Sequence, residues 1–330
     1  MQKFGLYDGL AGVAFSLSRL SRTDPDYEET ANEATNRLKA EARDNRYGVE
    51  WNAFCDVVSG TAGIGLALLD LSQTLRRPDL LELAVRAGEG LIGTGVQTAD
   101  GSYWPLTTED SWHYPNFAHG TAGVGYFLAK LFASQRRFKY LEAANSAARY
   151  LESMACKDGR YRGLIAHNQV DGRDLFYLGW CHGPPGTSRL FFQLYRETGD
   201  ESWWQHVSQS AATVMVSGAP ERTSSGYWNN VSRCCGAAAI AEWMLALFHH
   251  TAFEDYRIFA ERIAIYLLER ASSGSHGLSW TQAENRKHPG TLSAQTGLMQ
   301  GSAGVALFLI HLDESFHEIE PFIRFPDSPW

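Results

Sequence analysis

A glycine-rich step followed by an apolar segment recurs six times along this chain, and this repeat limits the folds that the chain can adopt. The six copies, here called the glycine steps, occupy residues 8–12, 59–63, 119–123, 182–186, 235–239 and 300–304. Their first glycines lie 51 to 65 residues apart, a loose period that corresponds to one helical hairpin with its loops. We therefore expect an architecture in which each copy adds a similar helical unit.

The segments that follow and separate the glycine steps predict two kinds of helix. Residues 63–69 and 304–310 are apolar nearly all round, which is typical of a buried helix. Amphipathic segments with a helical period occupy residues 26–43, 80–91, 138–154, 203–216 and 256–268. This alternation predicts an all-α chain folded as an α/α toroid, a double-layered barrel of inner and outer helices. Strand-like alternation is sparse, and local hairpins are expected only near residues 101–104 and 159–162.

The glycines themselves allow two interpretations. A glycine permits a tight turn and close helix packing where a Cβ atom would collide with its neighbours. Alternatively, the glycines bring backbone and helix N-termini toward a shared site. Both interpretations stay open, and they are compatible because an α/α barrel gathers the N-termini of its inner helices at one end.

Composition and charge exclude several classes of protein. The net charge of −8 argues against a general nucleic-acid binder, which needs a basic surface. No apolar run reads as a signal peptide or is long enough to cross a bilayer, and we expect a cytoplasmic protein. Five cysteines at irregular spacing do not form a disulfide framework, so free thiols or metal ligands are expected. With no linker in the sequence, we expect one domain over residues 1–330.

The glycine steps also act as a register that aligns chemically active residues. The positions just before the first glycines hold Asp8, Ser59, His119, His182 beside Cys181, Cys235 beside Cys234, and Gln300. Histidine and cysteine are rare in the chain, so their recurrence at equivalent places is unlikely to be chance. We expect these side chains at the mouth of the inner helices.

Three of the cysteines suggest a metal site. Cys181, Cys234 and Cys235 would give zinc three sulfur ligands and leave one tetrahedral position open, as in a catalytic zinc site. Three thiolates on Zn²⁺ carry a formal charge of about −1. A substrate thiol in the fourth position would lose its proton to the influence of the metal. Two alternatives stay open, namely buried thiols without a metal and a structural zinc whose fourth ligand is His182, Cys55 or Cys156.

Two further residues are candidates for proton transfer. His119 precedes a glycine step and carries an imidazole that can move protons near neutral pH. Asp56 lies four residues before Gly60 and is placed to orient or charge-pair a histidine. The alternatives are structural, because a histidine can bond a carbonyl and an aspartate can cap a helix.

The motifs together resemble those of the lanthionine synthetase C-like cyclases, including the cyclase domains of larger lanthipeptide synthetases. The matching segments are LYDGLAG at 6–12, NFAHG at 116–120, WCHG at 180–183, CCG at 234–236 and GLMQGSAG at 297–304. The resemblance covers almost the whole chain, and the ordered set is more specific than any single motif. There are two departures: Asn116 replaces a glycine of the family motif, and six glycine steps stand where family toroids usually have seven layers.

The resemblance implies a toroid around a zinc site that adds a peptide cysteine thiolate to dehydroalanine or dehydrobutyrine, closing a thioether ring. Cys181 and Cys234 match the two cysteine ligands of the family, and Cys235 occupies the place where most members carry histidine. His119 matches the residue proposed as acid and base, and Asp56 matches an acidic residue that assists it. Cys-Cys-Gly occurs in a subset of synthetases, so the resemblance implies a variant zinc site.

The implied partner is a dehydrated precursor peptide. The chain carries no kinase, lyase or dehydratase sequence, so it is expected to be a stand-alone cyclase or an excised domain, with dehydration done elsewhere. One alternative function is the addition of glutathione or another small thiol to dehydroamino acids in proteins. The other is a non-catalytic, zinc-stabilised binding platform. A carbohydrate-active α/α barrel is disfavoured because paired acidic residues at the glycine steps are missing.

Overall fold

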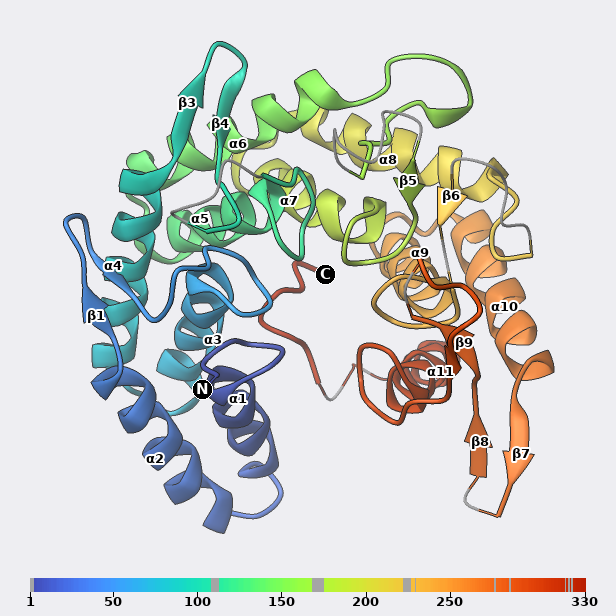
Figure 1. Cartoon of the computed structure of the whole chain (residues 1–330), viewed down its shortest axis with the longest axis horizontal. Helices are drawn as coiled ribbons and strands as arrows, with labels where there is room; N and C mark the ends of the chain where they lie inside the picture. The colour runs from blue at the N-terminus through green and yellow to red at the C-terminus, as the bar shows by residue number, and fades with distance from the viewer. Residues whose placement is uncertain are drawn as a thin grey trace. The chain divides into compact units, whose positions relative to one another are not determined.

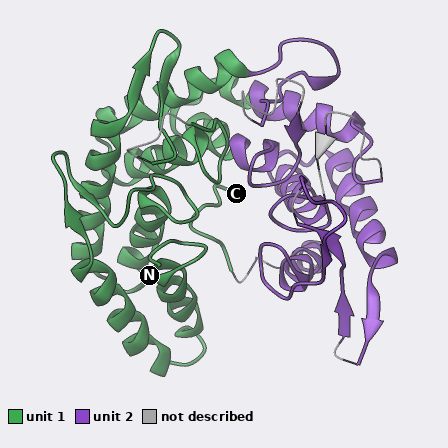
Figure 2. Ribbon diagram, viewed as in Figure 1, with its two compact units in different colours: residues 1–154, 189–204, 323–329 green, residues 155–188, 205–322, 330 purple. Residues whose placement is uncertain are grey.

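A computed structural model gives the fold of the chain. It describes residues 3–107, 113–167, 175–221, 227–228, 230–275, 277–284, 286–317, 319, 321 and 323–330. The chain divides into two compact units, coloured separately in Figure 2. Unit 1 contains residues 1–154, 189–204 and 323–329, and unit 2 contains residues 155–188, 205–322 and 330. The described part of the chain holds no helix long and apolar enough to cross a membrane.

Unit 1 is built from three pairs of helices that are adjacent in sequence and packed together (Figure 1). The pairs are α1 (Leu10–Leu20) with α2 (Asp26–Ala40), α3 (Thr61–Thr74) with α4 (Pro78–Thr94), and α5 (Thr121–Gln135) with α6 (Phe138–Met154). Helices α3 and α5 are buried almost all round, whereas α2, α4 and α6 bury one face. The predicted alternation of buried and amphipathic helices is therefore present in the α3–α4 and α5–α6 pairs, whereas α1 buries one face only.

Unit 2 repeats the pattern with a pair formed by α9 (Ala237–Thr251) and α10 (Glu254–Glu269), and α11 (Ser302–Phe316) packs against α9. Helices α7 (Pro184–Thr198) and α8 (Glu201–Val216) contribute residues to both units. Helix α9 is the buried member of its pair, since nine of its residues are buried, and α10 buries a single face. The α9–α10 pair follows the sequence pattern. The buried helix expected over residues 304–310 is wrong in part, because α11 buries only Gly304, Val305, Phe308 and Leu312 and leaves Ile310 53% exposed.

Short strands lie in the segments that connect the helices. Antiparallel pairs join β1 (Arg43–Asp44) to β2 (Val49–Glu50), β3 (Val96–Thr98) to β4 (Gly101–Tyr103), β7 (Ser272–Gly274) to β8 (Gly277–Ser279), and β9 (Gln282–Ala283) to β10 (Leu292–Ser293). Strand β5 (Phe176–Tyr177) pairs in parallel with β6 (Tyr227–Trp228). The hairpin expected near residues 101–104 is present. Near residues 159–162 the chain also folds back on itself, but the pairing is limited to a single antiparallel bridge between Ala155 and Ile165 around a 3-10 turn at Gly159–Tyr161.

The loop before each glycine step caps the helix that follows with its own backbone. In α3, the amides of Thr61, Ala62 and Gly63 donate to the carbonyls seven residues earlier, at 3.0, 3.1 and 3.0 Å. The same seven-residue spacing recurs at the starts of α1, α5, α9 and α11. The first amides of a helix have no partner inside it, and here loop carbonyls supply one without any side-chain cap.

This capping explains the glycines. A side chain at Gly60 would collide with the backbone of Phe54 and Asp56, which the loop brings against it. Its backbone is extended, so the requirement is for space and not for an unusual conformation. The glycines are therefore needed for close packing of the backbone. The same loops carry the residues that precede each glycine step.

Three tryptophans make the same hydrogen bond to the ends of α2, α4 and α10. The indole Nε1 atoms of Trp51, Trp104 and Trp280 each donate at 2.7 Å to a leucine carbonyl thirteen residues earlier, in α2, α4 and α10. These carbonyls lie near helix ends, where the intrahelical pattern leaves acceptor capacity for another donor. A buried indole needs a partner for its N–H group, and each of these bonds provides one.

Candidate functional site

The loops before α7 and α9 bring the three predicted ligand cysteines together in unit 2. The Sγ atoms of Cys181 and Cys235 lie 3.3 Å apart, and those of Cys234 and Cys235 lie 3.5 Å apart. All three sulfur atoms lie within 4.8 Å of one another. Residues 53 and 54 positions apart in sequence thus form one buried cluster, here called the thiol cluster.

Backbone bonds hold this cluster in place. The Cys181 amide donates to the Cys234 carbonyl at 3.0 Å, and the Cys234 amide donates to the Met299 carbonyl at 2.7 Å. The Cys235 amide donates to the Ser232 hydroxyl at 3.1 Å. A side chain at Gly179 would collide with the Cys235 backbone. The backbones of Cys181 and Cys234 are therefore held by carbonyls from another segment, and that of Cys235 by a side chain of its own loop.

The spacing of the sulfur atoms fits a zinc ion. Zinc–sulfur bonds of about 2.3 Å at a tetrahedral angle place sulfur atoms about 3.8 Å apart. The measured separations of 3.3 and 3.5 Å lie close to that value. Among the described residues, these cysteines are the one group of three or more histidine, cysteine or acidic side chains close enough to share a metal. The predicted ligand set is thus brought together by the fold.

The alternative fourth ligands are not brought to the cluster. Cys55 lies in unit 1, where its Sγ donates to the Pro105 carbonyl at 2.8 Å and burial raises its pKa. Neither Cys156 nor His182 belongs to the group of ligand atoms around the three sulfurs. Among the described residues, the group of potential metal ligands therefore consists of the three cysteines.

Buried thiols at this spacing influence one another's ionisation. Burial, followed by hydrogen bonding to Cys234 and Cys235, raises the pKa of Cys181 well above its usual value. Hydrogen bonds from Cys181 and Cys234 lower the pKa of Cys235 well below its usual value. A metal cation held by the three sulfurs would favour their thiolate forms.

Aromatic side chains that the sequence patterns did not reveal lie beside the thiol cluster. His167 stacks on Tyr177 with ring centroids 4.1 Å apart, and His182 meets the His167 ring edge-on at 4.3 Å. Burial raises the pKa of Tyr177, and Arg286 opposes this rise. The Gln300 Nε2 lies 3.9 Å from the Cys235 Sγ. Gln300 could be predicted from its position just before a glycine step. His167 and Tyr177 could not, because they lie in a loop and in a two-residue strand, where the sequence has no repeating pattern.

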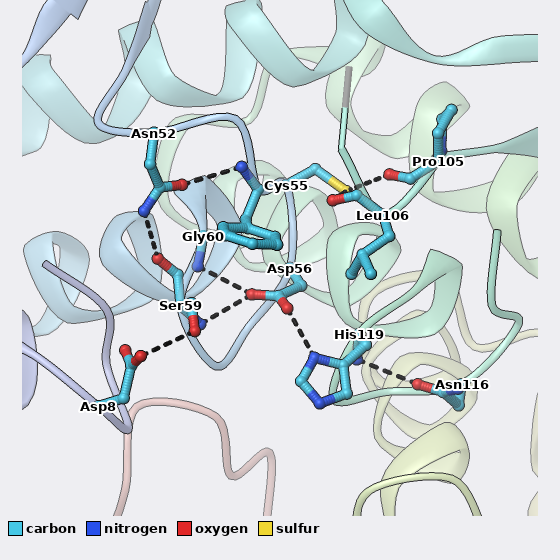
Figure 3. Close-up of polar contacts among 11 residues, drawn as sticks. Asp8, Asn52, Cys55, Asp56, Ser59, Gly60, Pro105, Leu106, Asn116 and His119 are labelled. Atoms are coloured by element: carbon cyan, nitrogen blue, oxygen red, sulfur yellow. Dashed lines mark hydrogen bonds and ion pairs between the residues drawn. The ribbon is translucent and has the colours of Figure 1, made fainter. Parts of the chain in front are cut away.

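Asp56 and His119 form a second constellation, in unit 1 (Figure 3). The Asp56 Oδ2 lies 2.7 Å from the His119 Nδ1, and its Oδ1 accepts from the amides of Ser59 and Gly60 at 2.8 Å each. The Asp56 side chain is 1% exposed, whereas that of His119 is 38% exposed. Asp56 thus pairs with the histidine and also accepts from two amides of the loop before α3, whereas the helix itself has no side-chain cap.

The surrounding loop orients this histidine. The Asn116 Oδ1 accepts from the His119 amide at 3.0 Å, which gives a local reason for asparagine in place of the family's glycine. An ionised carboxylate only accepts hydrogen bonds, so Asp56 favours the tautomer with its proton on Nδ1. The His119 Nε2 is then the atom that can exchange a proton, and the ring is partly open to solvent.

Comparisons with known proteins agree with these features. A family model described as lanthionine synthetase C-like protein matches residues 1–317. A zebrafish (Danio rerio) protein named glutathione S-transferase LANCL1 is 26% identical over 201 residues, which is 60% of this chain and 43% of that protein. The chain therefore spans less than half the length of this curated relative.

Solved structures show the fold. The nisin cyclase structure has a TM-score of 0.67 at 17% identity and covers 99% of this chain and 78% of its own. A polysaccharide lyase has a TM-score of 0.62 at 14% identity, covering 96% and 92% of the two chains. An α-1,6-mannanase from Salegentibacter has a TM-score of 0.55 at 16% identity, covering 81% and 79%. These similarities concern the fold alone, and the first confirms the predicted all-α class, an α/α toroid.

Proposed function

The chain belongs to the lanthionine synthetase C-like family, and we propose that it is a zinc-dependent lanthipeptide cyclase. It would add cysteine thiolates of a dehydrated precursor peptide to dehydroalanine or dehydrobutyrine, forming lanthionine or methyllanthionine rings. The observation that carries the proposal is the approach of three cysteine sulfurs to within 4.8 Å of one another. That arrangement in a member of this family supports a metal site with an open position.

Cys181, Cys234 and Cys235 would hold the zinc ion. When bound there, zinc would favour the thiolate form of an entering substrate thiol, whose free pKa is about 8.5. The buried backbone bonds of the three cysteines keep their sulfurs pointed at one place. We place the protein in the cytoplasm, since a reducing compartment keeps such close thiols from forming disulfides.

His119 and Asp56 would transfer the proton. As the substrate sulfur bonds to the β carbon of the dehydroamino acid, the electrons of its double bond move toward the neighbouring carbonyl as an enolate. Protonation of the α carbon by the His119 Nε2 completes the addition, and the thiol proton balances the one consumed. Asp56 holds the opposite ring nitrogen at 2.7 Å and stabilises the positive charge of the protonated ring.

Replacement of Asp56 by asparagine should slow ring formation about 10²-fold or more, because an amide lets the imidazole adopt the wrong tautomer. His119→Asn should have an effect at least as large. The matched control is His317→Asn, which changes an exposed histidine at the end of α11. Rates are measured with saturating zinc, and an Asp56→Asn rate within about threefold of the control would contradict the assignment.

Cys235→His should retain zinc and cyclise more slowly, by about tenfold. Histidine is a neutral ligand, so the formal charge of the zinc site changes from about −1 to about 0 and a bound substrate sulfur becomes less electron-rich. Zinc content and cyclisation rate are measured on the same preparation. A rate equal to that of the parent protein, with zinc fully bound, would contradict this account of the third cysteine.

The principal alternative is addition of glutathione or another small thiol to dehydroamino acids in proteins. The relative named glutathione S-transferase LANCL1, at 26% identity, favours keeping this alternative. A competition assay separates them: a dehydrated peptide with its own cysteine is incubated with glutathione, and products are weighed by mass spectrometry. Ring closure leaves the peptide mass unchanged, whereas addition of the small thiol raises it by the mass of glutathione.

Two further proposals concern the surroundings of the reaction. Dehydration of the precursor would be supplied by a dehydratase or by kinase and lyase activities, on a partner protein or a fused domain. A non-catalytic, zinc-stabilised binding platform remains the third reading of the chain. A zinc ion coordinated by four protein ligands, as measured by X-ray absorption, would favour the binding platform over the cyclase.

A further inference from the structure

A buried group of charged side chains lies next to Cys234 in the chain. Arg233 precedes this cysteine in the chain, is 4% exposed, and donates from its Nε to the Glu242 Oε2 at 2.8 Å. Glu242 lies on α9 and is shared with His311 of α11, whose Nδ1 lies 3.7 Å from the Glu242 Oε1. All of these residues belong to unit 2. A full guanidinium charge is thus kept in the interior beside a candidate metal ligand.

Met299 contacts both Arg233 and Cys234. The Met299 carbonyl accepts from the Cys234 amide at 2.7 Å, and the Met299 Sδ lies 3.6 Å from an Arg233 guanidinium nitrogen. The Arg233 Cβ also occupies the space that a side chain at Gly304 would need. The Arg233 side chain is therefore packed against the start of α11 and held by Met299 and Glu242.

The charges of the cluster call for such a cation. Three thiolates and one Zn²⁺ leave a formal charge of about −1 in a buried place, and an isolated buried charge is costly. Arg233 directly precedes Cys234 and is 4% exposed, so it keeps a cation in the interior next to this ligand in the chain. Glu242 carries the opposite sign, so it partly offsets the guanidinium while holding it in position.

We propose that Arg233 and Glu242 are a positioning pair that sets the charge balance of the cysteine metal site, with Arg233 strengthening and Glu242 moderating zinc affinity. This inference rests on the zinc site of the proposed function and extends it to residues that do not touch the metal. Residues that do not touch the metal typically change metal affinity by about tenfold or more, which sets the size of the effects expected here.

The test compares zinc affinities of the full chain by competition with a chromophoric chelator. Glu242→Gln keeps the shape of the side chain and removes the negative charge, and zinc should bind about threefold to tenfold more tightly. Arg233→Met removes the cation and leaves Glu242 unpaired, so binding should weaken by about tenfold or more. The double variant Arg233→Met, Glu242→Gln should lie between the two single variants.

The opposite signs of the two single variants separate electrostatics from structural damage. A pair that only supports the fold would give weaker zinc binding in both variants, and that result would overturn the proposal. Thermal unfolding of the metal-free proteins reports the fold independently, and Glu242→Gln alone decides the matter if Arg233→Met does not fold. An unmodified protein that binds no zinc would overturn both proposals, whereas zinc binding with the wrong order of variants would overturn only this one.

Discussion

Cys181→Ala is expected to remove stoichiometric zinc and to reduce ring formation to the uncatalysed rate. Structural zinc binds zinc-finger peptides with about 10–16 kcal/mol shared over four ligands, so loss of one thiolate should weaken binding by roughly 10²–10³-fold. The loss of zinc affinity should exceed this average, because Cys181 is the single ligand from its loop, whereas Cys234 and Cys235 are neighbours in the chain. Zinc content is measured by elemental analysis, and ring formation on a dehydrated precursor.

The matched control is Cys156→Ala. Cys156 lies in the same unit but outside the group of sulfur atoms, so this variant should keep both zinc and activity. The control separates loss of a ligand from loss of a thiol in general. Zinc retained at one equivalent in Cys181→Ala, or cyclisation at the parent rate, would contradict the assignment of this ligand.

The second large effect is expected on stability. Asp327 is 0% exposed and Arg189 is 7% exposed, and an Arg189 guanidinium nitrogen lies 3.0 Å from the Asp327 Oδ2 and 2.5 Å from its carbonyl. Asp327→Ala leaves the guanidinium buried without its carboxylate, which typically costs about 3–5 kcal/mol. That is a large share of the total stability of a protein domain. Equilibrium denaturation in urea measures the loss.

A double variant provides the control for this ion pair. Arg189→Met with Asp327→Leu removes both charges and fills the space with apolar atoms, so its stability should lie close to that of the parent protein. The guanidinium also lies over the Phe117 ring at 5.4 Å, two residues before His119, so the single variant should disturb the loop of the proton-transfer pair. A single-variant loss below about 1 kcal/mol would show that the pair is not held as the fold indicates.

Much of the helical organisation follows from local sequence. The glycine steps predicted the starts of α3, α5 and α9 because a helix that is apolar all round has few alternatives to burial. The segment predicted as 138–154 matches α6, whereas the one predicted as 26–43 ends at Ala40, where β1 begins after a short turn. Ends of amphipathic helices are set by the next packed element, which the period alone does not contain.

The candidate site was predictable only where the repeat marked it. Cys181, Cys235 and His119 stand at glycine steps, and Asp56 lies in the loop before one. Arg233, Tyr177 and His167 carry no such mark, since their roles depend on contacts between distant segments. The three indole bonds were also missed, although a tryptophan thirteen residues after a leucine is a spacing that could be searched for. The expected single domain over residues 1–330 stays a prediction.

The most direct test of the central claim is ring formation by the zinc-loaded protein. A dehydrated precursor peptide with one cysteine is incubated with protein that is zinc-loaded, stripped by a chelator, or stripped and resupplied with zinc. Remaining thiols are then alkylated and the peptide is weighed. The account predicts an unalkylated peptide of unchanged mass with the loaded and resupplied protein, and an alkylated peptide with the stripped one. A thiol that stays alkylatable with the zinc-loaded protein would contradict the claim.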